Sequence, residues 1–277
     1  MSHMSHIYRQ IGLVIYALVM VVRIDAAQSA PVPTISARTA NGVSSGIVDG
    51  AAYLGTPSGG SIASLFGTGL AASPVTATTL ALPTTLGGTT VIISGRAVPL
   101  FFITPTQINF QFPYEICCTE EMPVTVIVNG VSSNTIMVAA GGYGTFFTMF
   151  SVDSSGSGQG AIQIANTSIL AAPTGSIPGA QSRAAQRGEY LSIYCLGLGP
   201  VSNAPAAGNP APVDPLARSG TPTVWIGGVL APVTFAGLAP GTVGVYQVNV
   251  QVPAGAPSGN AVPVTMNSSN TVTIAVQ

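Results

Sequence analysis

The sequence has no lysine, and both of its histidines, His3 and His6, lie at the extreme N-terminus. Histidine is the commonest general base near neutral pH and a frequent metal ligand. The rest of the chain therefore lacks the residue on which Ser-His-Asp and Cys-His sites and most zinc sites depend. GVSSG at 42–46 matches the G-x-S-x-G pattern, but no histidine follows Ser44 to activate it. We expect a non-catalytic protein with no catalytic residues, no metal site and no cofactor.

Charge is also scarce, since only 5% of the residues are charged and the formal net charge is −1. This balance gives no electrostatic attraction to nucleic acid or to an anionic membrane surface, so we expect neither as a partner. Hydrophobic residues make up 47% of the chain, with 33 glycines and 22 prolines. Such a chain is too apolar to be disordered and too interrupted to form long helices.

Residues 1–30 have the layout of a secretory signal peptide. Arg9 precedes an apolar run from Ile11 to Val22, and small residues follow. The run is shorter than the roughly 20 residues that span a bilayer. We expect cleavage near residues 27–30 and a secreted, extracellular or cell-surface location. Because Arg23 and Asp25 interrupt the cleavage region, an uncleaved membrane anchor is the alternative.

Three cysteines, Cys117, Cys118 and Cys195, are disulfide candidates in an exported protein. Cys195 paired with Cys117 or Cys118 would link the two halves of the chain. A strained bridge between the two adjacent cysteines and three reduced thiols are the alternatives.

An internal repeat organises the chain. TQINFQFP at 106–113 returns as YQVNVQVP at 246–253, and neighbouring segments recur in the same order at offsets of about 130 to 140 residues. In each copy apolar side chains alternate with amides, as expected for a strand with one core-facing side. The segments are short, rich in Val, Ile and Thr, and bounded by Gly, Pro and Asn.

The repeat predicts an all-β fold. We expect two tandem immunoglobulin-like antiparallel β-sandwich domains that arose by internal duplication, preceded by a signal-peptide helix, with roughly seven strands per domain. Asn129 with Gly130 predicts a tight turn. The first domain is assigned to 31–139, including an extended N-terminal arm up to residue 45, and the second to 140–277.

Several motifs resemble a known family. SLFGTGLA, LPTTLGGT, PLFFITPTQINFQFP, LGLGP and FAGLAPGTVGVYQVNVQVP are similar to the uncharacterised extracellular C-terminal domain family of Acidobacteria, often called the Solibacter C-terminal domain. The resemblance runs from about Gly42 to Val276 and is most specific from Phe235 to Pro253. It implies a secreted β-sandwich and supplies no catalytic motif.

Two features are candidate ligand-binding groups. Trp225, the only tryptophan, could stack on a sugar ring, although its counterpart in the first copy is Ile92 and core packing is the simpler interpretation. The two amide triads could bind glycans, line an interface, form the polar outer face of a sandwich or hydrogen-bond to nearby loops. These triads are Gln107, Asn109 and Gln111 in the first copy, and Gln247, Asn249 and Gln251 in the second.

The functional hypothesis is a secreted or cell-surface structural or adhesive protein. A surface so poor in charge favours association with itself or with other extracellular surface proteins. In one form of the hypothesis the N-terminal arm adds as a strand to the open sheet edge of the next subunit and builds an extracellular filament. The alternative is a carbohydrate-binding accessory module.

Overall fold

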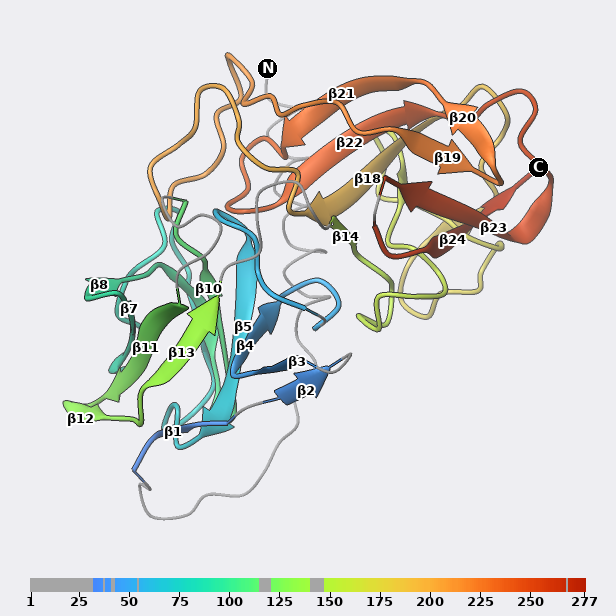
Figure 1. The fold of residues 1–277 in the computed structure, drawn as a ribbon. Coiled ribbons are helices and arrows are strands. Elements are labelled where there is room, and N and C mark those ends of the chain that lie inside the picture. The colour runs from blue at the N-terminus through green and yellow to red at the C-terminus, as the bar shows by residue number, and fades with distance from the viewer. Residues whose placement is uncertain are drawn as a thin grey trace. The chain divides into compact units, whose positions relative to one another are not determined.

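The computed structural model describes residues 32–36, 38–40, 43–53, 55–114, 121–139, 147–267 and 269–277, and the regular elements in these ranges are β-strands (Figure 1). The all-β prediction is therefore confirmed. The expected signal segment, the expected domain boundary near residue 140, Cys117 and Cys118 lie outside the described residues. Within the described ranges, no helix is long and apolar enough to cross a membrane.

The chain divides into two compact units, each with its own hydrophobic core. The N-terminal unit comprises the described residues from 32 to 139 together with Pro205–Pro210. The C-terminal unit comprises residues 147–204 and Ala211–Gln277. The chain thus leaves the C-terminal unit for one short segment and then returns to it.

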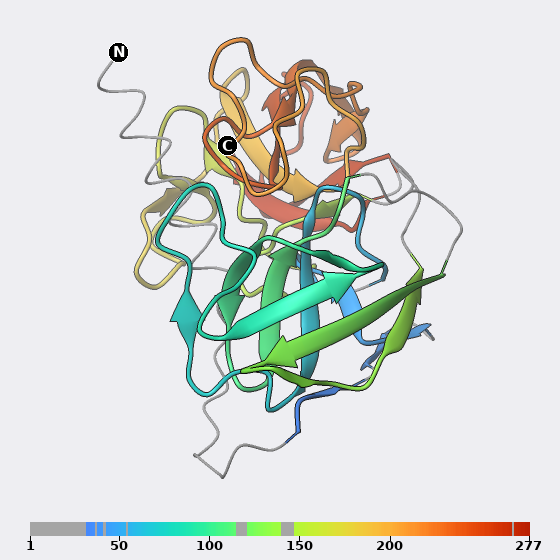
Figure 2. The same ribbon diagram turned by 90° about the vertical axis from the view of Figure 1, so that its left-hand side faces the viewer.

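The N-terminal unit is a β-sandwich with an additional hairpin. Its first sheet has the order β1-β5-β10-β9-β6, with β4 also paired to β5, and its second has the order β12-β11-β7-β8, with β13 also paired to β11. In Figure 2 the strands of this unit are coloured from blue to green. Strands β2 and β3 form a separate two-stranded sheet. The strands are β1 (Thr34–Ile35), β2 (Arg38–Ala40), β3 (Val43–Ser45), β4 (Ile47–Asp49), β5 (Ile62–Thr68), β6 (Val75–Thr76), β7 (Thr89–Ile93), β8 (Arg96–Ala97), β9 (Leu100–Ile103), β10 (Gln107–Gln111), β11 (Glu121–Val128), β12 (Val131–Ser132) and β13 (Ile136–Ala139).

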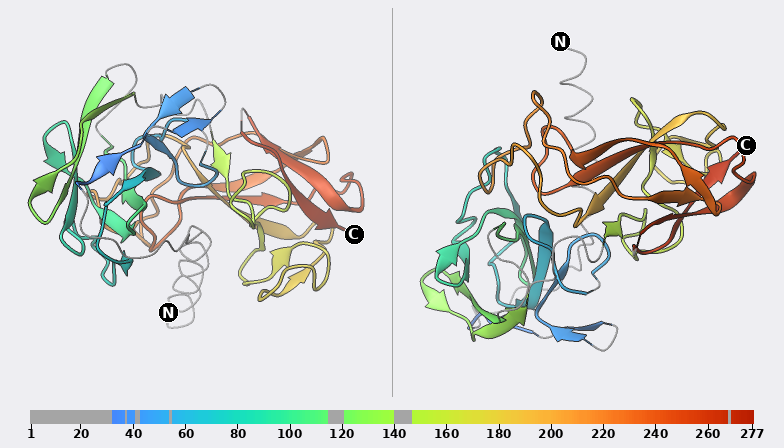
Figure 3. Two further views of the ribbon diagram at one scale, coloured as in Figure 1. Left: turned by 90° about the horizontal axis from the view of Figure 1, so that it is seen from below. Right: turned by 45° about the horizontal axis from the view of Figure 1, so that its top comes forward.

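The C-terminal unit is a second β-sandwich, seen from two further directions in Figure 3. One sheet has the order β17-β16-β15-β18-β22-β21, with β14 paired to β18, and the other has the order β20-β19-β23-β24. All strand pairs are antiparallel except β16 with β17. The strands are β14 (Thr148–Met149), β15 (Gln163–Ile164), β16 (Leu170–Ala171), β17 (Ser182–Arg183), β18 (Tyr190–Leu196), β19 (Val224–Ile226), β20 (Val229–Ala231), β21 (Val233–Leu238), β22 (Tyr246–Gln251), β23 (Gly259–Met266) and β24 (Val272–Val276).

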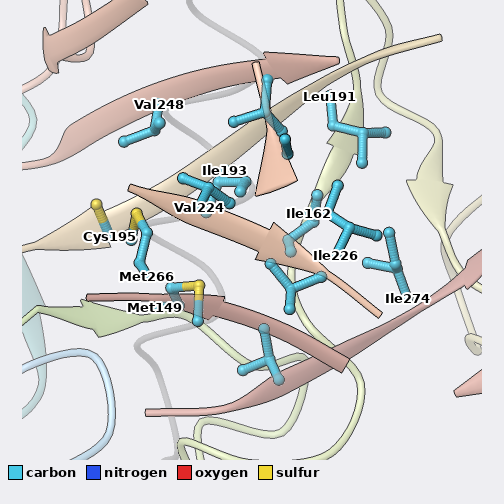
Figure 4. Close-up of a cluster of buried hydrophobic side chains, with 14 of the residues drawn as sticks. Met149, Ile162, Leu191, Ile193, Cys195, Val224, Ile226, Val248, Met266 and Ile274 are labelled. Atoms are coloured by element: carbon cyan, nitrogen blue, oxygen red, sulfur yellow. The ribbon is translucent and has the colours of Figure 1, made fainter. Parts of the chain in front are cut away.

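The alternation seen in the sequence decides which side chains form the cores. Ile108 and Phe110 of β10 are fully buried in the core of the N-terminal unit, as are Val248 and Val250 of β22 in the C-terminal unit. Figure 4 shows side chains from both sheets of the C-terminal unit meeting in one apolar layer. Burial of such side chains stabilises a fold by about 1.5–3 kcal/mol each.

The two units share a strand order. The run β5-β10-β9 in one corresponds to β18-β22-β21 in the other, and β13-β11-β7-β8 corresponds to β24-β23-β19-β20. Each unit contains more strands than the expected seven, because several pairings involve only two or three residues. Such short strands leave too little alternation in the sequence to be recognised.

The expected N-terminal arm is not a single extended segment. Thr34 and Ile35 form the first strand of the N-terminal unit, paired with Thr68 and Gly67 of β5. The residues that follow fold into the β2–β3 hairpin, in which Arg38 lies opposite Ser45.

Candidate functional site

Amides on β10 form a buried hydrogen-bond network. Gln107 donates from Nε2 to Oδ1 of Asn109 over 2.8 Å, and the same oxygen accepts a 2.9 Å bond from the hydroxyl of Ser64 on β5. Asn109 lies directly opposite Ser64 in the sheet. Because Asn109 is only 2% exposed, this amide face of the strand is internal rather than a solvated outer face.

Gln111, at the end of β10, binds two loops. Its Nε2 donates to the carbonyl of Gly60 over 3.0 Å and contacts the hydroxyl of Tyr114 at 3.2 Å. Its Oε1 accepts a 2.6 Å bond from the backbone N–H of Gly208, in the segment that returns to this unit. Gly60 has a φ of +76°, and a Cβ there would overlap the Tyr114 ring. Glycine is therefore needed for this close approach.

The second amide triad repeats these contacts in the C-terminal unit. Gln247 donates to Oδ1 of Asn249 over 2.8 Å, and Ser192 of β18 donates to the same oxygen over 3.2 Å. Gln251 donates to the carbonyl of Gly188 over 2.9 Å, and Gly188 has a φ of +85°. All three amides of this triad are half-buried.

The repeated partners favour a structural role for the six amides. In both units the first amide bonds to the second, the second accepts from a serine on the neighbouring strand, and the third holds a glycine carbonyl in a loop. Buried amides are normally satisfied in this way. A ligand that bound either triad would have to replace these internal bonds.

Among the described residues of the C-terminal unit, the side-chain oxygen of Gln163 is buried without a hydrogen-bond partner. Gln163 lies opposite Ser192, in the same cross-strand row as Asn249. Its side chain is 3% exposed, and Oε1 has no hydrogen-bond partner among the described residues. The counterpart position in the N-terminal unit is Val48, opposite Ser64, so this polar group has no equivalent in the other unit.

A pair of asparagines that the sequence analysis overlooked holds the first strand of each unit. Asn134 accepts from the N–H of Ile35 over 2.7 Å and donates to its carbonyl over 3.2 Å. Asn270 makes the same two bonds to Met149, at 2.7 and 2.9 Å, and a third to the carbonyl of Gly156 at 2.7 Å. The signal was present in the sequence, because SSNT occurs both at 132–135 and at 268–271.

Trp225 lies on a different sheet from the amides of its unit. It is half-buried on β19, opposite Leu230 of β20 and Thr265 of β23. Its neighbours Val224 and Ile226 face the core, so Trp225 faces away from it. Leu230 is 61% exposed. The hydrophobic core separates this face from the Gln247 triad, so the two candidates do not form one site.

The remaining candidates supply no chemical site. Cys195 is buried in the core of the C-terminal unit, and pairing with Cys117 or Cys118 stays a prediction because those two lie outside the described residues. Within the part of the chain that the structure describes, no group of three His, Cys, Asp or Glu side chains could hold a metal ion.

Comparison with known proteins gives little further information. No protein-family model and no curated protein match the chain, so the Acidobacteria resemblance stays a prediction. Among solved structures, SGBP-B of the Bacteroides ovatus mixed-linkage glucan utilization locus, in complex with a mixed-linkage heptasaccharide, matches at 12% identity with a TM-score of 0.32. The match covers 80% of this chain and 43% of that one, so the chain spans less than half the length of that protein.

Proposed function

We propose that the protein is a non-catalytic, secreted or cell-surface structural or adhesive protein that associates with itself. The observation that carries this proposal is a set of large apolar side chains that stand in solvent on a chain with very few charges. They are Val32, Leu80, Val131, Met137, Tyr190, Val213 and Leu230, each between 46% and 66% exposed. Soluble β-proteins normally keep their sheet edges apart with charged side chains, and lysine in particular.

The repeated architecture supports the same proposal. The two sandwiches share strand order, amide triads and asparagine clamps, as expected from duplication of one immunoglobulin-like domain. The signal-like N-terminus and the family resemblance favour export. In an exported protein with these features the exposed apolar positions serve contacts between copies, and head-to-tail contacts would build filaments.

Binding of a glycan is the second candidate. The observation that favours it is the row Thr265, Trp225 and Leu230 across three strands, in which the aromatic ring faces away from the core. An outward aromatic ring flanked by an apolar and a hydroxyl side chain suits the apolar face and hydroxyl rim of a sugar.

The two candidates separate in one set of measurements. We expect sedimentation velocity of the purified mature protein to show mass that rises with concentration, and Trp225→Ala to leave this behaviour unchanged. Retention on immobilised glycans that Trp225→Ala abolishes, and that Ile92→Ala at the matching position of the N-terminal unit preserves, would support the second candidate. A wild-type protein that stays monomeric at every concentration and salt would contradict the proposal of self-association.

A further inference from the structure

The last strand of each unit lies at the edge of a sheet, and in the C-terminal unit this edge is covered. Strand β24 pairs with β23 on one side. On its other side the N–H of Thr273 donates to the carbonyl of Gly158 over 2.6 Å, and the carbonyl of Thr273 accepts from Gly160 over 2.8 Å. A segment of the same chain therefore occupies the edge.

Among the described residues, nothing pairs with the equivalent edge in the N-terminal unit. The carbonyl of Pro123 accepts from Ser94 of the turn after β7, so the backbone of Pro123 faces β7. The backbone groups of an inner strand alternate in direction, so the residues on either side of Pro123 bond to β13. Met137 lies opposite Pro123, and its backbone N–H and carbonyl therefore point away from β11. Among the described residues no partner meets the N–H or carbonyl of Met137, and its side chain is 52% exposed.

Comparison of the two units shows what is missing from this edge. A Cβ on Gly160 would lie 2.9 Å from Val272, the first residue of β24, and a Cβ on Gly46 would overlap Ile136, the first residue of β13. Gly160 and Gly46 therefore occupy equivalent positions, each against the first residue of the last strand of its unit. The residues before Gly160 then cover the edge of β24, whereas those before Gly46 form the β2–β3 hairpin. The segment that pairs with β24 in the C-terminal unit thus has a counterpart in the N-terminal unit that forms the hairpin instead of pairing with β13.

The hairpin also has an edge with which no described strand pairs. Ala40 lies opposite Val43 across a two-residue connection, and such a pair exchanges both of its hydrogen bonds. The backbone of the next residue, Thr39, therefore faces away from β3. No third strand pairs with the hairpin among the described residues. Because a two-stranded hairpin is marginally stable by itself, a further strand on this side would stabilise it.

Charge favours a second copy of this chain as the partner. Strand β13 contains neither charge nor proline, the usual protections of an edge. If Thr39 lies opposite Met137 in an antiparallel pair, Arg38 lies opposite Val138, at the end of the sheet where Glu121 is exposed and paired with Ala139. An antiparallel pair thus brings Arg38 and Glu121, which carry opposite charges, to the same end of the sheet, whereas a parallel pair would place them at opposite ends.

We propose that the β2–β3 hairpin of one copy adds through its Thr39 edge to the β13 edge of a second copy. This assignment rests on the proposed self-association. It specifies the donor strand, which is the Thr39 edge of the hairpin, and the acceptor strand, which is the edge of β13. The two surfaces differ, so each copy keeps one free donor and one free acceptor. The contact therefore extends head to tail and does not close into a symmetric dimer.

Proline substitutions test the donor and the acceptor separately. Met137→Pro removes an outward N–H that has no partner among the described residues, and Thr39→Pro removes the corresponding N–H on the hairpin. We expect each to weaken association by about tenfold or more. Thr76→Pro is the matched control, because Thr76 is an exposed residue of edge strand β6. The next residue, Ala77, donates to the carbonyl of Phe101, so the backbone of Thr76 faces away from β9. Thr76→Pro should associate like the wild type, and circular dichroism should show that all three variants are folded.

Mixing the two variants gives the decisive result. Met137→Pro keeps its donor and Thr39→Pro keeps its acceptor, so the mixture should form one-to-one dimers that grow no further. If the wild type associates and both variants do so equally well, the assignment is wrong while self-association stands. If Thr39→Pro still dimerises and only Met137→Pro is monomeric, β13 pairs with itself and the hairpin donor is refuted. A monomeric wild type would instead refute the proposed function.

Discussion

Gln111 and Gln251 occupy matching positions of the repeat but differ in the number of bonds they make, which allows the structural role of the amides to be measured. Gln111→Ala removes three hydrogen bonds, to Gly60, Gly208 and Tyr114, from a side chain that is 1% exposed. At about 1 kcal/mol for each bond, the expected loss is about 3 kcal/mol of unfolding free energy. Gln251→Ala removes a single exposed bond, and we expect about 0.5–1 kcal/mol.

The position of Trp225 allows the two units to be followed separately. This sole tryptophan lies in the C-terminal unit, so its fluorescence during denaturant unfolding reports that unit, while hydrogen exchange of β10 amides reports the N-terminal unit. Gln111→Ala should accelerate exchange in β10 and leave the tryptophan transition in place. Gln251→Ala should shift the tryptophan transition slightly. Equal, small effects of the two substitutions would show that Gln111 does not hold its loops, and would return the buried triad to the candidates for ligand binding.

Two further predictions concern stability. Asn270→Ala should destabilise its unit by about 3 kcal/mol and Asn134→Ala by about 2 kcal/mol, because they remove three and two bonds respectively; equal unfolding midpoints for the two variants would contradict this order. The hydrogen bond from Arg183 lowers the pKa of Glu189 below its ordinary 4.5. A lowered folded-state pKa adds stability above the unfolded value, and that stability is lost as the pH falls through the folded value. Glu189→Gln should therefore cost less than about 1 kcal/mol at neutral pH, since the Arg183 side chain is 37% exposed, and its unfolding curve should merge with that of the wild type in acid.

Strands with a clear pattern could be predicted from the sequence. Alternation in TQINFQFP and YQVNVQVP correctly indicated which residues of β10 and β22 enter the cores. The Asn129–Gly130 turn is also confirmed, with φ values of +49° and +84°. Strands such as β15 and β16 could not be predicted, because two residues have no measurable period and become strands only through their pairing with neighbours.

By itself, the sequence determined the β class, the repeat and the side of each long strand that faces the core, because these follow from local alternation and turn residues. Only the tertiary structure decided which partners the other side of each strand and its backbone edge have. Gln111 accepts a hydrogen bond from Gly208, which is distant in sequence. The edge of β24 is paired with residues near Gly158, whereas no described residue pairs with the edge of β13. The physical reason is that alternation fixes the direction of a side chain or backbone group, whereas its partner comes from whichever loop the folded chain brings to it.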